Sequence, residues 1–509
     1  MKKVASLAGL PSDRGLRVEV DGQKILLVRD GNSVRAYSAV CPHAGGPLEE
    51  GAVCNGRIVC PWHKGTFRLS DGALMEPPAL DALVAFPVRL DGDAIFVDSR
   101  PASRPHSLRR RQDEAFLIVG AGAAGGTAAA ALREFGFGGR IVLIGRESGL
   151  PFDRTSLSKF VISGEMKPED TPPLRTPAFY DEQEIERIDA EIVSFDAARR
   201  ELALADGREF SFARALLAPG GEPKSLDLPG VRKQGVHVLR SREDAASILA
   251  DIRPNARAVI LGSSFIGLEV ASCLRAQQIA VDVVSPEQIP FARQFGERIG
   301  ESLRALHEAN GVVFHAGVKP ARVEGDAHVS AVVLEDGRRL RADLVVMGVG
   351  VQPRTGFIRG AALRSDGGVI VDAQMRACES VFAVGDIAAF PLPPEGKPTR
   401  IEHWRVAQQQ ARIAAANMVG GEVIYDATPF FWTYHYGQNF EYLGHADRWS
   451  DEIVLGDVKK QNFVAFLLQG QRVAAVVACG RERLTAILTE RMRTPLMKDE
   501  AVLLARNQA

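Results

Sequence analysis

Cysteine is scarce in this chain. The 509 residues include only six cysteines, and three of them, Cys273, Cys378 and Cys479, stand alone in the sequence. Domains that depend on disulfides carry cysteine at a much higher density. A disulfide framework is therefore excluded, and we expect a cytoplasmic protein. The other three cysteines lie close together near the start of the chain.

An excess of either charge is also missing, since 62 basic and 63 acidic residues give a formal net charge of -1. No strongly basic field is available to attract nucleic acid. No segment approaches the roughly 18 uninterrupted apolar residues that a transmembrane helix needs. The first residues include two lysines but no Ala-x-Ala-like signal-peptide cleavage site. We expect no nucleic-acid partner and no membrane span.

The length provides for several domains. At roughly 150 residues per domain, a chain of this size predicts about three to four domains. Hydrophobic residues make up 46% and charged residues 25% of the chain, which is ordinary for globular proteins. A single small binding module and a mainly disordered chain are both excluded.

The N-terminal hundred residues carry a candidate metal site. Short alternating apolar runs, separated by Asp-Gly and Asn-Gly pairs, predict a small all-β domain of hairpins. Two of its loops read Cys41-Pro-His43 and Cys60-Pro-Trp-His63. Two thiolates and two imidazoles on tight turns suit either a structural zinc ion or an iron–sulfur cluster. The ligand types alone leave both open.

The residues around these ligands resemble the Rieske ferredoxin family over about residues 1 to 100. The resemblance rests on glycines beside the ligands and on the segment that follows the second loop: Gly45, Gly46, Gly65 and Lys64-Gly-Thr-Phe67. It implies a 2Fe-2S cluster with two cysteines on one iron and two histidines on the other. The implied ligands are Cys41, His43, Cys60 and His63.

A linker and a dinucleotide-binding motif come next. Residues 101–115 are basic, contain proline and lack periodicity, which predicts a linker. A predicted strand at 115–119 leads into Gly120-Ala-Gly122-Ala-Ala-Gly125 and an alanine-rich helix. The glycines permit a tight turn and close approach of a pyrophosphate to the helix N-terminus. Beyond a second strand, Glu147 is the expected partner of a ribose hydroxyl, and Arg146 is the alternative.

A second unit of the same kind begins at residue 258. A predicted strand leads into Gly262-Ser-Ser264-Phe-Ile-Gly267, where Ser264 replaces the middle glycine, and a further strand follows. Two such units predict two dinucleotides, and the economical pair is a flavin with a nicotinamide that reduces it. The alternative is that one unit is only a structural repeat.

Residues 116 to about 490 resemble the FAD-dependent, NAD(P)H-using ferredoxin-reductase family. The whole chain is similar to the apoptosis-inducing-factor-like branch that carries an N-terminal Rieske domain. The motifs that carry the resemblance are the segments 150–159, Gly348-Val-Gly350, Val381-Phe-Ala-Val-Gly385-Asp386, Glu402-His-Trp404 and Phe430-Phe-Trp432.

The resemblance also implies roles for single residues. Arg154 would contact the nucleotide half of FAD, and Asp386 its ribityl chain. Trp404 belongs to the segment that closes on the flavin. Lys159 would lie by the isoalloxazine, paired with Glu269, and these two are the expected catalytic residues. The cation would favour a reduced, anionic flavin.

For the nicotinamide we expect NADH, with NADPH as the alternative. Ser285 occupies the strand-end position where NADH-specific family members have an acid. Glu287, two residues further on, is the expected ribose partner. No arginine that could bind a 2′-phosphate appears before Arg293.

The predicted fold is multi-domain: an all-β Rieske domain, two Rossmann-like α/β dinucleotide-binding domains and a C-terminal α+β domain. The expected segments are the Rieske domain 1–100, the linker 101–115, the FAD-binding domain 116–236 and 361–425, the NAD-binding domain 237–360 and the C-terminal domain 426–509.

The expected function is an NAD(P)H-dependent flavoprotein reductase. It would pass electrons from NADH through FAD to the fused 2Fe-2S centre and on to an oxygenase, a cytochrome or a quinone. Residues 120–165 contain no cysteine, which disfavours dithiol chemistry at the flavin. The alternative is an NADH-binding, redox-sensing interaction protein of apoptosis-inducing-factor type with slow turnover. A homodimer is kept open.

Overall fold

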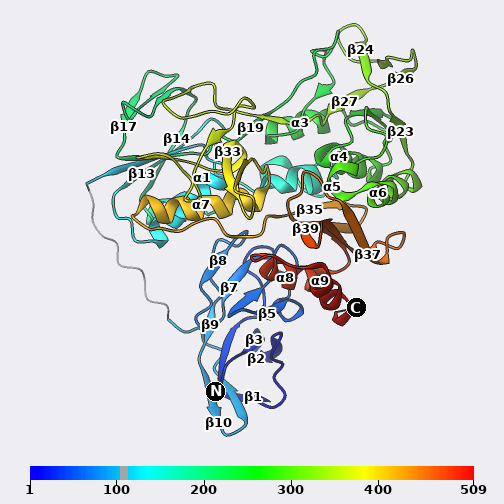
Figure 1. Ribbon diagram of the computed structural model, residues 1–509. Coiled ribbons are helices and arrows are strands. Elements are labelled where there is room, and N and C mark those ends of the chain that lie inside the picture. The colour runs from blue at the N-terminus through cyan, green and yellow to red at the C-terminus, as the bar shows by residue number, and fades with distance from the viewer. Residues whose placement is uncertain (104–112, 509) are drawn as a thin grey trace.

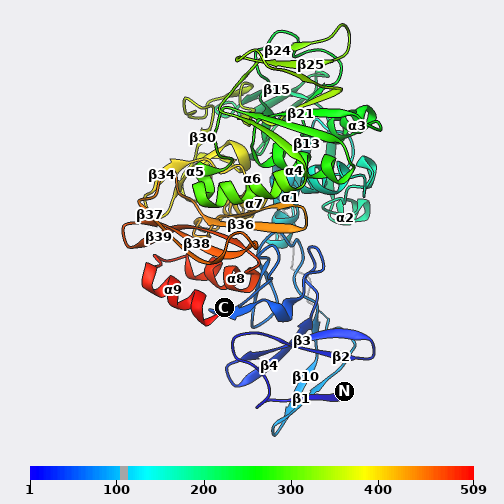
Figure 2. The ribbon, with the colours of Figure 1, turned by 90° about the vertical axis from the view of Figure 1, so that its right-hand side faces the viewer.

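The computed structural model describes residues 1–103 and 113–508. Two α/β lobes lie side by side at the top of Figure 1, and the N-terminal β domain projects below them. The C-terminal helices lie beside the N-terminal domain in both ribbon views (Figures 1 and 2). Most of the expected linker, residues 104–112, lies outside the described residues.

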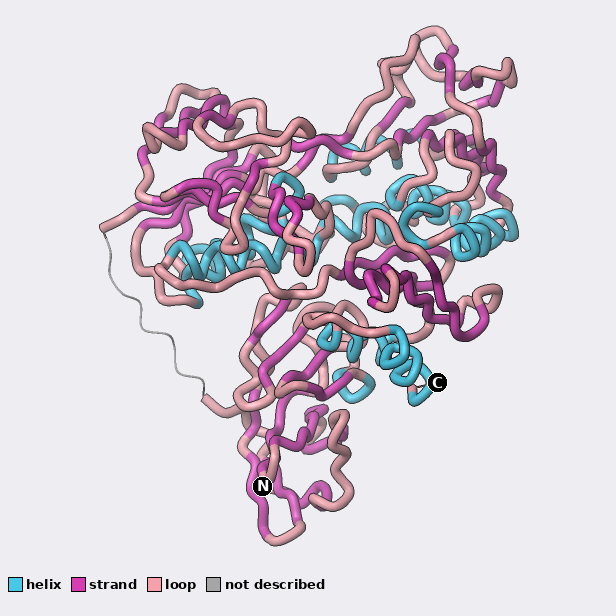
Figure 3. Tube along the Cα trace, viewed as in Figure 1, coloured by secondary structure: helices cyan, strands magenta, loops and turns pink. Residues whose placement is uncertain are grey.

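The N-terminal domain is built from strands, as Figure 3 shows. Its three sheets have the orders β1-β11-β10, β2-β3-β4-β9 and β5-β6-β7-β8. The strands are β1 (Lys2–Ser6), β2 (Leu16–Val20), β3 (Gln23–Asp30), β4 (Ser33–Ser38), β5 (Ala52–Cys54), β6 (Arg57–Val59), β7 (Thr66–Arg68), β8 (Leu74–Glu76), β9 (Ala85–Phe86), β10 (Val88–Asp91) and β11 (Ala94–Val97). Asp21-Gly22 and Asn55-Gly56 have positive φ at both positions, as a type I′ hairpin turn requires.

The first lobe contains a six-stranded sheet of order β14-β13-β12-β18-β32-β31. All of its pairings are parallel except that of β31. Its elements are β12 (Ala115–Val119), α1 (Ala123–Glu134), β13 (Arg140–Gly145), α2 (Pro177–Glu182), β14 (Ile185–Asp189), β18 (Arg214–Leu217), β31 (Arg376–Cys378), β32 (Val381–Ala383) and α7 (Trp404–Met418). β12 and β13 are buried along almost their whole length, as expected for parallel strands covered on both faces.

The second lobe contains a five-stranded sheet of order β20-β27-β21-β22-β23, in which every pairing is parallel. The chain enters this lobe after β18 and returns to the first sheet at β31 and β32. The elements are β20 (Val236–His237), α3 (Arg242–Asp251), β21 (Arg257–Leu261), α4 (Phe265–Ala276), β22 (Ala280–Ser285), α5 (Ala292–Phe295), α6 (Glu297–Ala309), β23 (Val312–Ala316) and β27 (Leu344–Met347).

The C-terminal domain is an antiparallel sheet of order β35-β36-β39-β38-β37, packed against two helices. Its elements are β35 (Phe430–His435), β36 (Gln438–Gly444), β37 (Asp451–Asp457), β38 (Asn462–Gln469), β39 (Arg472–Cys479), α8 (Glu482–Arg491) and α9 (Lys498–Asn507). Within the described part of the chain, no helix has the length and apolar character to cross a membrane.

Short strands complete the two lobes. They are β15 (Ile192–Asp196), β16 (Glu201–Leu204), β17 (Glu209–Ser211), β19 (Gly221–Pro223), β24 (Pro320–Glu324), β25 (Ala331–Leu334), β26 (Arg339–Arg341), β28 (Val351–Pro353), β29 (Ile358–Arg359), β30 (Val369–Ile370), β33 (Ala388–Leu392) and β34 (Lys397–Thr399). β19 pairs with β28 where the chain passes between the lobes.

Candidate functional site

A cavity of about 830 Å³ is enclosed by both lobes and the C-terminal sheet. Its wall brings together most of the residues that the sequence nominated: Gly120, Gly122, Glu147, Arg154, Lys159, Ser264, Glu269, Asp386 and Trp404. Four other residues expected at the nucleotides are not part of the described wall, namely Gly125, Gly262, Gly267 and Glu287. Segments far apart in the sequence therefore share one site.

The first glycine motif forms a close turn between β12 and α1. Gly120 has φ +105°, and a Cβ there would lie 2.1 Å from the carbonyl oxygen of Ala218. A Cβ on Gly125 would lie 1.8 Å from the carbonyl oxygen of Gly120. Gly122, the N-cap of α1, faces open space instead. The helix N-terminus is thus bare toward the cavity, which suits a pyrophosphate.

The second glycine motif repeats this turn between β21 and α4. A Cβ on Gly267 would lie 2.5 Å from the carbonyl oxygen of Gly262, which itself has φ +103°. Ser264 is the N-cap of α4, and its hydroxyl donates to the carbonyl of Gly348 at 2.6 Å. The same hydroxyl accepts a hydrogen bond from the Gly267 N–H at 3.5 Å and so caps the helix. Ser264, Phe265 and Ile266 line the cavity, so the remaining amides of this turn fit a phosphate group.

Of the two acidic residues expected to bind the riboses, one lines the cavity and the other does not. Arg154 donates to Glu147 Oε1 at 2.7 Å, and both line the cavity. Arg146 instead pairs with Glu222 at 3.0 Å. Glu287 is exposed at the end of β22 and accepts a hydrogen bond from Ser285 at 2.7 Å. Its contact with a ribose stays a prediction.

Asp386 has a partner that sequence reasoning missed. Its Oδ2 accepts a hydrogen bond from Arg240 at 2.8 Å, and both residues line the cavity. Arg240 precedes the N-cap Ser241 of α3 and belongs to no recognisable motif. No local signal could have nominated it, because the contact joins residues 146 positions apart.

Lys159 and Glu269 form the expected pair in the cavity wall. Their Nζ and Oε2 atoms are 2.9 Å apart, and their side chains are 11% and 6% exposed. Lys159 belongs to a short π-helical turn, η3 (Leu157–Val161), and Glu269 to α4. Ser158 and Thr433 also donate to this carboxylate. A shielded cation is thereby held at the cavity by a fully hydrogen-bonded carboxylate.

The cavity also contains a half-buried imidazole at the start of α7. The His403 ring stacks on Phe431 with 4.0 Å between the ring centroids. Burial lowers the pKa of His403 to about 3, so this imidazole is neutral at physiological pH. Trp404, the first residue of α7, lines the same wall.

The four candidate metal ligands come together as two pairs. His43 Nδ1 and His63 Nδ1 are 3.2 Å apart. Cys41 and Cys60 are both buried, and their thiols lie close enough to interact. No three histidine, cysteine or acidic side chains in the described chain meet at one point. Two imidazoles beside two thiols fit a two-iron cluster with a different ligand pair on each iron.

Glycines leave room around these ligands. Gly45 has φ +79° in the first ligand loop. A Cβ on Gly46 would lie 2.9 Å from Cys60 Sγ, whereas one on Gly65 would lie 3.6 Å from Cys41 Sγ. Backbone bonds from Cys41 to Gly46 and from Cys60 to Gly65 close both loops. The loops are thus fixed around the donor atoms.

The ligand loops lie against the wall of the cavity. The His63 ring packs on Trp432 of β35, with 4.4 Å between the ring centroids. Trp432 also lines the cavity. A single aromatic side chain therefore separates a candidate metal ligand from the nucleotide site.

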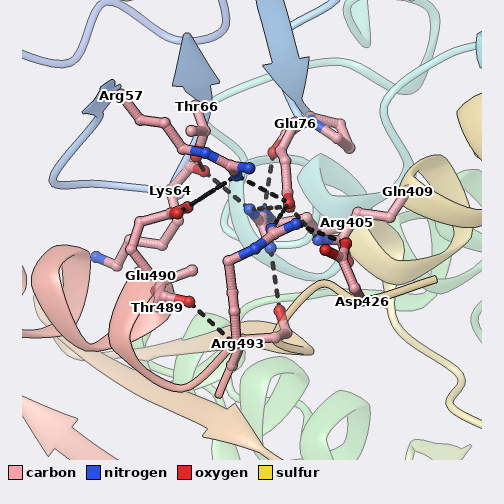
Figure 4. A network of polar contacts seen from close by, with 12 residues as sticks. Arg57, Lys64, Thr66, Glu76, Arg405, Gln409, Asp426, Thr489, Glu490 and Arg493 are labelled. Atoms are coloured by element: carbon pink, nitrogen blue, oxygen red, sulfur yellow. Dashed lines mark hydrogen bonds and ion pairs between the residues drawn. The ribbon is translucent and has the colours of Figure 1, made fainter. Parts of the chain in front are cut away.

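Buried polar contacts hold the N-terminal domain in this position, as Figure 4 shows. Arg405 of α7 is fully buried and contacts Glu76 of β8 at 2.9 Å. Its guanidinium also donates to the carbonyls of Pro77 at 2.8 Å and Lys64 at 3.0 Å. Arg493 completes the contact to Glu76 from the C-terminal domain. One carboxylate thus joins three parts of the chain.

A second buried contact lies beside the ligand loop. Lys64 is fully buried, and its Nζ lies 2.7 Å from Glu441 Oε1 of β36. Arg57 of the N-terminal domain pairs with Glu490 of α8 at 3.3 Å. Ala52, Val59 and Ala486 form a small apolar cluster across the same boundary. The domain is therefore docked by polar and apolar contacts alike.

Three family models match the chain. The model described as Rieske [2Fe-2S] domain matches residues 1–87. The model described as Pyridine nucleotide-disulphide oxidoreductase matches residues 115–411, and the model described as Reductase C-terminal matches residues 430–504. Their order confirms the predicted multi-domain organisation. The Rieske match also decides between the zinc ion and the cluster in favour of the cluster.

Curated relatives include Apoptosis-inducing factor 3 of Homo sapiens, 34% identical over 96% of this chain and 83% of that protein. Another is the Biphenyl dioxygenase system ferredoxin--NAD(+) reductase component of Paraburkholderia xenovorans, 34% identical over 75% of this chain and 93% of that protein.

Two solved structures share the fold. One is the Ferredoxin Reductase for the CYP199A2 System from Rhodopseudomonas palustris, with TM-score 0.72 and 30% identity over 78% of this chain and 100% of that chain. The other is the covalent putidaredoxin reductase–putidaredoxin complex, with TM-score 0.71 and 30% identity over 77% of this chain and 95% of that chain.

Proposed function

This chain belongs to the pyridine nucleotide-disulphide oxidoreductase family and carries a Rieske [2Fe-2S] domain, and from this premise we propose that it is an NADH-dependent flavoprotein reductase. It passes electrons from NADH through FAD to its own 2Fe-2S cluster and on to a separate acceptor. When bound, a flavin takes up two electrons together and releases them singly, and a Rieske cluster accepts one at a time.

The single observation that carries this proposal is the contact between His63 and Trp432. A cluster ligand packs 4.4 Å, centroid to centroid, from a side chain that lines the nucleotide cavity. The buried contacts of Glu76 and Lys64 keep the two sites together. The cluster is therefore reduced in cis, within one chain.

The residues of the cavity have different roles in binding the two nucleotides. Backbone groups at the starts of α1 and α4 bind the two pyrophosphates, and Glu147 binds a ribose. Arg240 holds the Asp386 carboxylate, which orients the ribityl chain. Lys159, held by Glu269, supplies positive charge where the flavin ring binds. Trp404 lines the same wall and would cover the ring and exclude water.

Several finer assignments belong to the same proposal. The two parallel sheets are Rossmann-like domains, the first for FAD and the second for NADH. NADH is preferred over NADPH because Glu287 follows β22 and no arginine stands in the sequence between β22 and Arg293. Because relatives are named for dioxygenase systems and for rubredoxin, the acceptor is a one-electron carrier or oxygenase. A cytoplasmic location and a homodimer stay predictions.

Anaerobic stopped-flow mixing of the holoenzyme with NADH tests the function. The flavin and cluster absorbance bands are followed separately. We expect bleaching of the flavin band, followed by reduction of the cluster within the turnover time. A flavin band that changes while the cluster stays oxidised would refute reduction in cis. It would favour the alternative, a slowly turning NADH-binding sensor.

A further inference from the structure

A buried chain of polar side chains leads away from the Lys159–Glu269 pair. Thr433 of β35 donates to Glu269 Oε1 at 2.8 Å. The same hydroxyl lies 3.0 Å from His435 Nε2. Thr433 and His435 are both fully buried, and neither belongs to a cofactor motif. The cavity wall is thus hydrogen-bonded to a buried histidine behind it.

A second buried histidine continues this chain. His307 of α6 meets His435 edge to face, with 5.1 Å between the ring centroids. His307 Nδ1 lies 3.3 Å from the hydroxyl of Tyr436, which is partly exposed. Among the described residues, His435 Nδ1 and His307 Nε2 have no hydrogen-bond partner although both atoms are buried. The side chains thus reach from the cavity toward the surface.

The proposed reaction releases a proton, which this row of polar side chains could carry to solvent. With a one-electron acceptor A, the net reaction is NADH + 2 A(ox) → NAD⁺ + H⁺ + 2 A(red). The C–H bond of the nicotinamide breaks, both electrons leave through the acceptor, and one proton is left in the cavity. Lys159 is a cation already, whereas the Glu269 carboxylate beside it can take up a proton.

We propose that a proton relay connects the cavity with solvent, a role that rests on the electron transfer proposed above. Its members, in order, are Glu269, Thr433, His435, His307 and Tyr436. Thr433 has one hydroxyl hydrogen, which it donates to Glu269 while that carboxylate is charged. A proton on Glu269 Oε1 turns this oxygen into a donor. The threonine hydrogen then turns to His435 Nε2.

The two histidines are suited to pass the proton on. Burial lowers the pKa of His435 to about 3, with a further contribution from Lys159, and burial also lowers the pKa of His307. Each ring is therefore neutral, with one N–H and one lone pair, and can accept at one nitrogen and release from the other. One buried water would join the two unpartnered nitrogens.

The variant Thr433→Val tests the relay because valine has the shape of threonine without its hydroxyl. Thr489→Val is the matched control, since Thr489 is also buried but its hydroxyl bonds, within the described residues, only to the carbonyl of Thr485 in its own helix. The holoenzyme is mixed with NADH and ferricytochrome c in weak buffer with a pH-indicator dye. Electron arrival and proton release are then recorded separately.

We expect Thr433→Val to slow proton release by at least about tenfold, as for loss of a positioned proton-transfer group, with flavin bleaching little changed. His435→Gln, which keeps a hydrogen-bonding group but cannot relay, should behave alike. Proton release at the wild-type rate in both variants would overturn the relay. Equal slowing of bleaching and proton release would also overturn it, because Thr433 would then only position Glu269. If NADH fails to reduce the cluster in the wild type, the proposed function itself is wrong.

Discussion

Replacement of Glu76 by glutamine should undock the N-terminal domain. Glu76 is buried and faces Arg405 at 2.9 Å, with Arg493 in contact and Arg57 at 3.8 Å. Glutamine keeps the shape but removes the charge, so the fully buried Arg405 loses its counter-ion, whereas Arg493 keeps only its pair with Asp426. Loss of one partner of a buried pair costs about 3–5 kcal/mol.

This free energy acts on the docking equilibrium because Arg405 and Arg493 lie outside the N-terminal domain. At about 1.4 kcal/mol per factor of ten, the docked form becomes about a hundredfold to several thousandfold less favoured. The connection through residues 101–115 still keeps the domain nearby, at an effective concentration of order mM. We therefore expect Glu76→Gln to leave a folded domain that spends much of its time undocked.

Two measurements check this expectation. Hydrogen exchange at the amides of residues 64–66 and 76 should become faster, and stopped-flow reduction of the cluster should slow while flavin bleaching by NADH stays unchanged. Asp71→Asn makes the same chemical change in an exposed pair with Arg68, in which both side chains are about half exposed. That control should cost no more than about 1 kcal/mol.

The reasoning fails if Glu76→Gln retains wild-type exchange and wild-type cluster reduction. The buried carboxylate would then not be needed for docking. If Asp71→Asn slows cluster reduction as much as Glu76→Gln does, the effect would reflect general loss of charge in the domain.

Three further predictions concern the cavity and the docked domain. Trp432→Leu should slow cluster reduction about tenfold, equivalent to about 1.4 kcal/mol in the barrier, without slowing flavin bleaching; unchanged cluster reduction would remove Trp432 from the path between the two sites. Lys159→Met should slow flavin reduction by NADH about a hundredfold, as for other charged groups that stabilise a transition state, and an unchanged bleaching rate in stopped flow would end that assignment. Burial favours a raised pKa for Glu76, but Arg405 and Arg493 outweigh it and leave the pKa below the ordinary 4.5. The stabilisation of docking by the charged carboxylate is therefore complete above that pH and is lost as the pH falls through the lowered pKa. Amide protection at the docked surface that decreases between pH 7 and pH 5 would contradict this.

The order of the domains and the cofactor motifs could be read from the sequence because each depends on local chemistry. A ligand loop needs its cysteine, histidine and glycine within a few residues. A dinucleotide turn needs its glycines between a strand and a helix, and the structure shows why, since a Cβ on Gly125 or Gly267 would collide with the preceding turn. The predicted pairing of Lys159 with Glu269 relied on resemblance, because the two residues are 110 positions apart.

Other contacts were decided by the tertiary structure alone. Glu76 and Arg405 are 329 positions apart, and neither belongs to a motif. In the sequence they read as ordinary charged residues, which are usually exposed. They are buried because the N-terminal domain packs onto α7 and the C-terminal domain, and a buried charge is tolerated only beside its partner. The sequence by itself thus predicted which groups this protein can bind, whereas only the packing of its domains determined that the candidate ligand His63 lies against Trp432 in the cavity wall.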